Sequence, residues 1–206
     1  MANSRDDVLN TALGILRRYG LADLSMRRVA AELNVQPSAL YWHFANKQAL
    51  LTALADTVLA GVTPRSARTR WDRRLERLAG DLRAALLAVT DGAELVSAGQ
   101  AGGLSTAAIG GYLTEAARQG GLSERDAGAV RTAIWQLVIG LTIEQQTRAQ
   151  MERLGAAAPS DRDFDREFAD GLGLVLDGAR HRAGQNGNTP NVEFTYLVGP
   201  GFGGVG

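Results

Sequence analysis

The sequence contains no cysteine, a single lysine and two histidines among its 206 residues. Without cysteine the chain can form neither a disulfide nor a thiolate metal site, and it has no thiol nucleophile. The histidines, His43 and His181, leave little room for histidine-based metal or acid–base chemistry. We therefore expect no metal site and no cofactor.

Long apolar runs and a net charge are missing as well. No stretch approaches about eighteen consecutive apolar residues, so a membrane span is not expected, and the polar N-terminus lacks the apolar region of a secretory signal. Basic and acidic residues number 22 each, which argues against a general polybasic nucleic-acid binder. These absences, with 45% hydrophobic residues, predict a globular cytoplasmic protein.

Motifs of common enzyme classes are also missing. The chain has no Gly-x-Ser-x-Gly elbow, no Walker loop and no His-Glu-x-x-His. Residues 199–204 match G-x-G-x-x-G, but that motif binds a dinucleotide only between a strand and a helix, and two residues remain after it. We therefore do not expect an enzyme.

Most of the chain has the apolar spacing of amphipathic helices, with steps of three and four residues. From this spacing we expect the all-α fold class. A break with Pro64 divides the chain into parts at 1–60 and 61–182, and we expect the helix before the break to touch both parts. A Gly- and Asn-rich tail follows at 183–206, where Val192 to Val198 has strand-like composition. The predicted helices cover 4–19, 25–34, 37–43, 46–59, 71–89, 92–99, 104–119, 123–153 and a stretch from Phe164.

Residues 25–43 have the outline of a helix–turn–helix. Two short amphipathic helices flank a tight turn at residues 34–36, and the second helix has a polar and aromatic face. In DNA-binding proteins such a helix enters the major groove while neighbouring cations contact phosphates. The side chains placed to contact DNA are Arg27 and Arg28 before the turn, Tyr41, Trp42 and His43 in the second helix, and Lys47 at the next helix start.

Three segments closely resemble the tetracycline-repressor (TetR) family. They are Leu24 to Ala30, Val35 to Phe44, and Asn46-Lys47, and the run Leu40 to His43 is the most characteristic. The resemblance implies an all-helical homodimeric repressor. Each subunit would have an N-terminal three-helix DNA-binding domain and a larger ligand-binding and dimerisation domain. It further implies palindromic double-stranded operator DNA and a small-molecule effector as partners.

Roles in DNA binding carry over by position from the resemblance. Arg27 matches a base-contacting position, and Tyr41 and Lys47 match positions that grip phosphates. Trp42 and His43 match positions that contact DNA or brace the helix, whereas Leu40 and Phe44 are expected in the core and Arg28 could be a solvated surface charge. Met26 and Pro37-Ser38-Ala39 depart from the tetracycline repressor, so a different operator is expected. The recognition helix starts with Gln36, Pro37, Ser38 and Ala39.

The second part resembles the family's tetracycline-repressor subfamily at Trp71, at 91–93 and at 139–144. Glu144 matches the glutamate that helps hold magnesium there, but the partner histidine is replaced by Val96 or Ser97. Magnesium–tetracycline is therefore not the expected effector, and Glu144 is expected to be a surface or interface carboxylate.

An apolar helical domain can instead hold a small, largely apolar effector between its helices. Each candidate lining residue could equally be ordinary core. A helical adaptor that binds only protein, or an activator without an effector, are the alternative functions, and steep salt dependence of DNA binding separates a repressor from an adaptor. The candidate lining is Leu82, Leu86, Val96, Tyr112, Ile134, Trp135 and Val138.

Overall fold

The computed structural model describes residues 4–64, 68–99 and 104–186, and every regular element in these ranges is a helix. This confirms the all-α prediction. No helix in the described ranges is both long and apolar enough to cross a membrane. The helices are α1 (Arg5–Tyr19), α2 (Met26–Glu32), α3 (Pro37–Leu40), α4 (Lys47–Leu59), α5 (Trp71–Leu87), α6 (Gly92–Gly99), α7 (Leu104–Gln119), α8 (Glu124–Arg153) and α9 (Phe164–Asn186).

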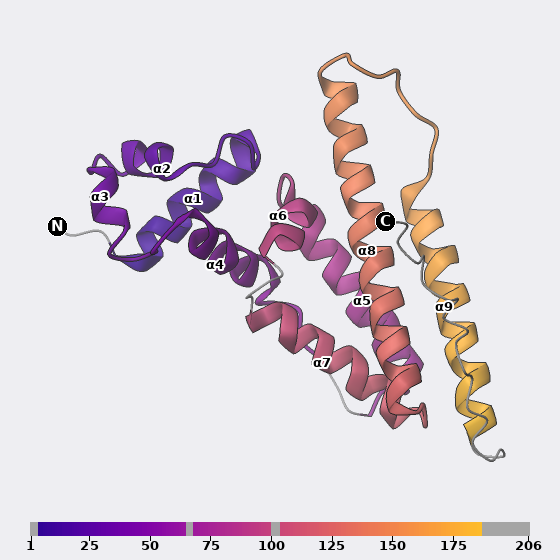
Figure 1. Cartoon of the computed structure of the whole chain (residues 1–206). Coiled ribbons are helices and arrows are strands. Elements are labelled where there is room, and N and C mark those ends of the chain that lie inside the picture. The colour runs from indigo at the N-terminus through magenta and orange to yellow at the C-terminus, as the bar shows by residue number, and fades with distance from the viewer. Residues whose placement is uncertain (1–3, 65–67, 100–103, 187–206) are drawn as a thin grey trace, which may run out of the picture.

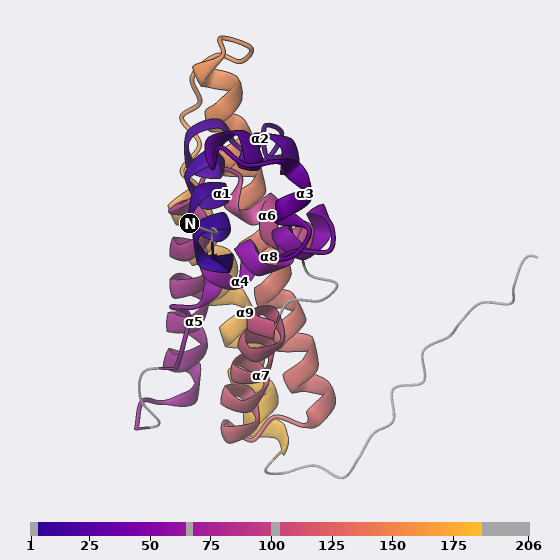
Figure 2. The same cartoon turned by 90° about the vertical axis from the view of Figure 1, so that its left-hand side faces the viewer.

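The helices form a small group, α1–α4, beside a larger group, α5–α9 (Figure 1). Helix α4 leads from the small group to the larger one and packs on α1, α5, α6 and α7, as expected for the helix before the break. In the larger group, the long helices α8 and α9 lie side by side, and α5 and α7 cover one face of α8 (Figure 2). The small group is thus a head on a helical body.

Helix starts are defined by side-chain caps, which satisfy backbone N–H groups that have no partner within the helix. Ser4 and Asp7 form a reciprocal capping box at α1. Oxygen atoms of Ser25, Asn46 and Ser123 accept from backbone N–H groups at the starts of α2, α4 and α8. The four N-cap residues therefore set where α1, α2, α4 and α8 begin.

One continuous apolar core runs through both groups, from Val8 in α1 to Ala179 in α9. Helix α4 contributes the fully buried Leu50 and Leu54 to it. At the far end of the body, the Trp71 ring packs so closely on Gly120 that a Cβ there would lie 2.3 Å from Trp71 Cδ2. Only glycine fits at that crossing.

A buried carboxylate ties α9 to the start of α5. Asp72 is fully buried and accepts from Arg180 Nε at 2.8 Å, from Arg70 Nη2 at 2.7 Å and from the Arg73 backbone N–H at 2.9 Å. Burial raises the pKa of Asp72, but the hydrogen bonds from Arg180, Arg70 and Arg73 outweigh it, so the pKa lies below its usual value. The cluster therefore stays charged near neutral pH.

The largest differences between the observed and the predicted boundaries are at the end of α3 and at the end of α9. Helix α3 ends at Leu40, and residues 41–43 form a turn in which the His43 N–H donates to the Leu40 carbonyl. Helix α9 continues past residue 182 to Asn186, so the first residues assigned to the tail are helical. The strand-like run at 192–198 lies outside the described residues.

Candidate nucleic-acid interface

The helix–turn–helix is built by α2, α3 and the turn between them. Asn34 adopts the left-handed conformation, with φ of 53°, which asparagine tolerates better than most residues. The Val35 N–H then donates to the Ala30 carbonyl at 3.0 Å. This closes the turn and sends α3 away from the axis of α2.

At the end of α3, exposed rings lie between two buried apolar side chains. Leu40 and Phe44 are buried, at 1% and 3% exposure, and fix the helix to the head. Between them, Tyr41 is 53% exposed and Trp42 is 90% exposed, while His43 is half-buried. An indole held this far into solvent adds little to the fold. Together with the adjacent exposed Tyr41 it forms an aromatic patch, and exposed apolar patches mark interaction surfaces.

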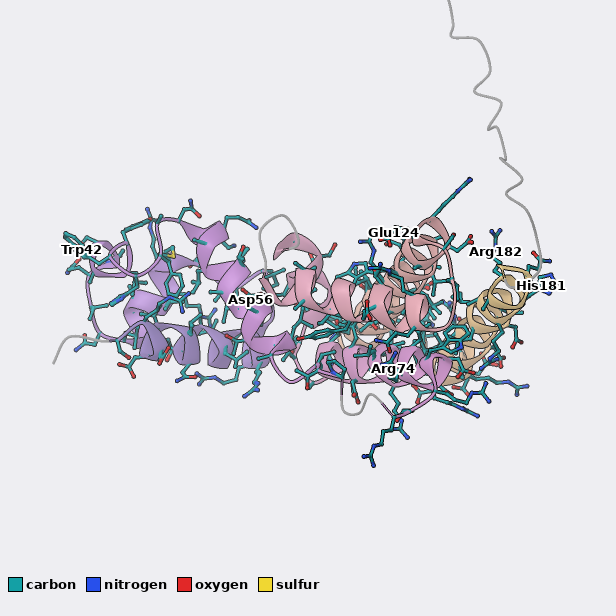
Figure 3. All side chains as sticks on the ribbon, turned by 90° about the horizontal axis from the view of Figure 1, so that it is seen from below. Trp42, Asp56, Arg74, Glu124, His181 and Arg182 are labelled. Atoms are coloured by element: carbon teal, nitrogen blue, oxygen red, sulfur yellow. The ribbon has the colours of Figure 1, made fainter. Side chains whose placement is uncertain are left out.

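Trp42 lies at the tip of the head, at the opposite end of the molecule from His181 and Arg182 (Figure 3). The expected recognition helix begins at Gln36, a few residues before Trp42 in the chain. Gln36 is the N-cap residue of α3, but its side chain makes no capping hydrogen bond. Its carboxamide is therefore left for an outside partner. Of the positions expected to begin the recognition helix, Gln36, Ser38 and Ala39 are exposed and Pro37 is half-buried.

Two exposed cations lie in the helices that precede and follow α3 in the chain. Arg27 lies in α2, and Lys47 is the first residue of α4. At the α4 start, the free N–H groups and the helix dipole add to the lysine charge, which favours a phosphate. We name the surface formed by Arg27, Gln36, Tyr41, Trp42 and Lys47 the head surface.

Arg28 differs from Arg27 because it is held within the head. Its guanidinium pairs with Asp23 and lies 4.0 Å from the centre of the Tyr19 ring. These contacts brace α2 against α1. Arg28 therefore has a structural role that the sequence did not indicate, and it is less available to DNA than Arg27.

Helix α4 also connects the head to α6 in the body. Gln48 Nε2 donates to the Ala98 carbonyl at 2.9 Å. Gly99, at the end of α6, packs so closely on α4 that an added Cβ would lie 3.1 Å from Ala55 Cβ. A shift of α6 would therefore move α4, and with it the head.

A second contact joins the end of α1 to the turn between α5 and α6. The Leu21 N–H donates to Asp91 Oδ2 at 2.8 Å, and Thr90 Oγ1 donates to the Arg17 carbonyl at 3.0 Å. Gly20, with φ of +83°, makes room for the Asp91 carboxylate, since a Cβ there would lie 2.5 Å from it. The head is thus attached to the body at two places.

Gln146 of α8 fixes the corner that carries Asp91. Its Nε2 donates to the Leu86 and Val89 carbonyls at 3.1 and 2.8 Å, and its Oε1 accepts from the Ala93 N–H at 3.2 Å. These bonds satisfy the end of α5 and the start of α6 together. A change in α8 would therefore reach the turn that holds the head.

Most of the expected effector-lining residues are packed into the apolar core. Tyr112 is half-buried against the same cluster, and Trp135 lines a hollow between α7 and α8. The residues expected to line the effector site therefore belong to one apolar cluster, but most of them are core residues and only Trp135 borders a hollow. The residues that are fully buried there are Leu82, Leu86, Val96, Ile134 and Val138.

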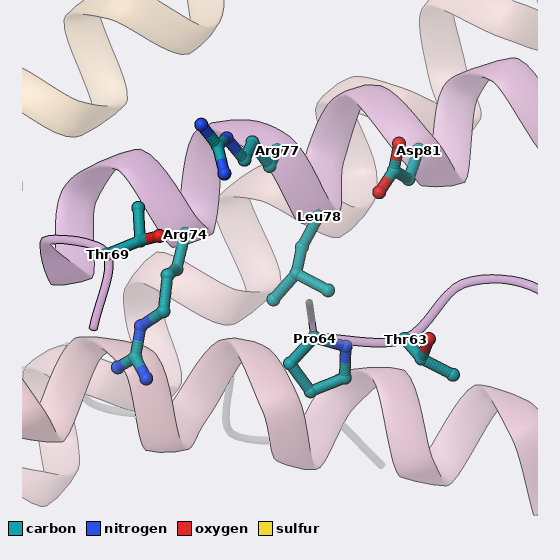
Figure 4. A pocket seen from close by; sticks show the side chains of 7 residues that line it. All are labelled: Thr63, Pro64, Thr69, Arg74, Arg77, Leu78 and Asp81. Carbon is teal, nitrogen blue, oxygen red and sulfur yellow. The ribbon is translucent and has the colours of Figure 1, made fainter. Parts of the chain in front are cut away.

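A small hollow lies between the segment after α4 and helix α5 (Figure 4). It is lined by apolar groups of Pro64 and Leu78 and by charged groups such as Arg74 and Asp81. Its volume of about 20 Å³ suits one water molecule and no organic ligand. It is therefore not a candidate effector site.

Glu144 forms an ion pair with an arginine from the loop before α9. Arg162 Nη1 and Nη2 donate to its two carboxylate oxygens at 2.6 and 3.1 Å, and Arg162 also binds Glu167. The hydrogen bonds from Arg162 lower the pKa of Glu144 more than its burial raises it. Within the described ranges no cluster of metal-ligating side chains occurs, and Glu144 is engaged as a surface carboxylate.

Comparison with known proteins places both groups of helices in one family. The pattern of "Bacterial regulatory proteins, tetR family" matches residues 8–54, and that of "Tetracyclin repressor-like, C-terminal domain" matches residues 63–158. Tetracycline repressor protein class C of Escherichia coli is 36% identical over 162 residues, which cover 73% of this chain and 70% of that protein.

Solved structures agree with this assignment. The crystal structure of Mycobacterium smegmatis BioQ superposes with a TM-score of 0.81 at 42% identity, covering 87% of this chain and 99% of that one. A crystal structure of BioQ with its natural double-stranded DNA operator gives a TM-score of 0.76 at 40% identity, covering 86% and 98%. The chain therefore belongs to the tetR family of bacterial regulatory proteins, a family of DNA-binding transcriptional regulators and not of enzymes.

Proposed function

We propose that this protein is a homodimeric, sequence-specific repressor that is released from a palindromic operator by a small, largely apolar effector. The observation that carries the proposal is the head surface. Trp42 is 90% exposed two residues after the buried Leu40, and Arg27 in α2 and Lys47 at the start of α4 are exposed as well. The related protein BioQ has been crystallised with its double-stranded DNA operator, which supports a DNA-binding role for this head.

A second copy of the chain fits the face formed by α8 and α9. Leu174 is 75% exposed there, in a shallow hollow of about 310 Å³ that also has the small residues Ala129, Ala133 and Gly178 in its lining. A two-fold axis through this face would form a four-helix bundle. It would also present two recognition helices, which a palindromic site requires at about 34–36 Å.

Release by an effector requires that the ligand bind the non-DNA-binding arrangement more tightly. The contacts of α4 with α6 and of Asp91 with Leu21 are the places where such a difference would reach the head. About a hundredfold induction needs roughly 2.7 kcal/mol of coupling, which is the scale of one or two charge-assisted hydrogen bonds. Since the proposed target is DNA, the expected cytoplasmic location follows from the same proposal.

The test is operator binding as a function of salt. Fragments of the source genome are selected on the purified protein, and the affinity for the best fragment is compared with a scrambled one between about 50 and 200 mM salt. We expect a steep loss with salt and a preference of at least about a thousandfold. Equal, salt-insensitive binding would refute the repressor and favour the adaptor that binds only protein.

A variant pair connects that result to the head surface. Trp42→Ala removes an exposed ring and should weaken operator binding at least about tenfold, with unchanged thermal stability. Leu154→Ala is the matched control, because Leu154 is a 75% exposed apolar residue at the end of α8, outside the head. Equal affinity of Trp42→Ala and wild type would contradict the proposed contact surface. Gel filtration at micromolar concentration should give a dimer, and a monomer there would contradict the proposed assembly.

A further inference from the structure

A hollow of about 320 Å³ lies between α7 and α8. This volume is within the range of small-molecule sites. Trp135, which is only 7% exposed, supplies one wall. The other lining residues are Thr106, Ala107 and Gly110 of α7 and Arg131, Thr132 and Gln136 of α8.

Three polar side chains of this hollow, those of Thr106, Arg131 and Gln136, have no partner among the described residues. Thr106 Oγ1 is buried without a hydrogen bond, which is unfavourable unless another molecule supplies one. Among the described residues, Arg131 makes no ion pair and Gln136 makes no side-chain hydrogen bond. Other arginines of the body, such as Arg162 and Arg180, are paired with carboxylates.

A glycine of α7 lies opposite the arginine in this hollow. A Cβ at Gly110 would lie 3.5 Å from Arg131 Cδ, so the arginine stem lies against α7 at this point. The guanidinium is thereby placed on the same hollow as the Trp135 indole. A planar cation and a rigid aromatic wall next to each other suit a ligand with a carboxylate and an aromatic ring.

We propose that the α7–α8 hollow binds a planar aromatic carboxylate, with the carboxylate on Arg131, the ring on Trp135 and a hydrogen bond to Thr106. This rests on the proposed function, since it names the chemical class of the effector. The site lies beside α8, which holds the α5–α6 corner through Gln146. It adds an anionic group to an effector expected to be largely apolar.

The test uses isothermal titration of the full chain with 2-naphthoate and with its neutral analogue 2-naphthamide. We expect 2-naphthoate to bind about tenfold to a hundredfold more tightly than the amide, and Arg131→Gln to remove that difference. Arg153→Gln is the matched control, because Arg153 is exposed in the same helix. Thr106→Val should weaken binding several-fold, and Gly110→Leu should abolish it by filling the hollow.

The outcomes separate this site from the proposed function. Equal 2-naphthoate affinity in wild type and Arg131→Gln, or no binding of 2-naphthoate, would overturn the proposed site. Neither result would affect the separate test of operator binding. Loss of the dimer in Arg131→Gln would also overturn it, because Arg131 would then serve a subunit contact. Arg131-dependent binding by a protein that ignores DNA would support the site and refute the repressor.

Discussion

Replacing Asp72 should destabilise the body, and the size of the effect follows from the hydrogen bonds that Asp72 accepts from Arg180, Arg70 and Arg73. Each hydrogen bond to a charged group contributes about 1.5–3 kcal/mol net. The Arg70 side chain is 74% exposed and contributes little after screening, which leaves Arg180 and the Arg73 N–H. Asp72→Ala still leaves Arg180 paired with Asp177 at 2.6 Å, so no cation is stranded. Two such bonds sum to about 3–6 kcal/mol. Because the Arg180 side chain is itself 37% exposed, its share is reduced by screening, and we expect a loss of about 2–4 kcal/mol.

Two further variants show whether charge or shape is responsible. Asp72→Asn keeps the shape and one acceptor, so it should cost about half as much as Asp72→Ala. Asp177→Asn is the control, because Asp177 is 72% exposed, and it should cost less than about 0.5 kcal/mol. The assay is urea unfolding at fixed protein concentration. An Asp72→Ala variant within about 0.5 kcal/mol of wild type would refute the reasoning.

The same cluster predicts a pH dependence. The pKa of Asp72 is lowered in the folded state, so its contribution is fully present above its unfolded value near about 4. That contribution is lost as the pH falls through the lowered folded value. The stability difference between wild type and Asp72→Asn should therefore be constant from about pH 8 to pH 5 and shrink below about pH 4. A difference that grows on acidification would contradict the charged assignment.

Three other predictions concern the head surface and α7. Lys47→Ala should weaken binding to all DNA and lower the salt slope by about one; an unchanged slope argues against a phosphate contact. Arg27→Ala should relax preference at one base pair and cost roughly 1–3 kcal/mol, whereas equal loss on operator and random DNA removes that assignment. Gly111→Ala should raise the free energy of unfolding by about 0.5–1 kcal/mol, because an added Cβ there meets nothing within 4 Å; a decrease measured in urea contradicts this.

The helices could be predicted from sequence because their signals are local. Ser4, Ser25, Asn46 and Ser123 cap helices where the apolar spacing begins. The left-handed Asn34 ends the first helix of the helix–turn–helix. Helix α3 is shorter than predicted because the chain must turn at 41–43 to reach the Asn46 cap.

The contacts between distant residues could not be predicted in the same way. Arg27 and Arg28 are neighbours in sequence, and only the position of Asp23 and Tyr19 in space engages one of them. Apolar residues of a core and of a ligand site have the same spacing along a helix. The sequence therefore could not show that Val96 is buried in the core whereas Trp135 lines a hollow. The bond from Leu21 to Asp91 spans 70 residues, so no local pattern in the sequence could indicate it.

The most direct test of the account is a hydroxyl-radical footprint of the wild-type protein on a genomic fragment selected by it. Two copies of the head surface, related by a two-fold axis, should protect two matching half-sites on one face of the duplex, about one helical turn apart. At the protein concentration that just saturates the wild-type footprint, protection should be lost in Trp42→Ala, whose affinity is expected to be at least about tenfold lower, and should persist in Leu154→Ala. A single unsymmetrical protected stretch, or protection that survives loss of the Trp42 ring, would contradict the account.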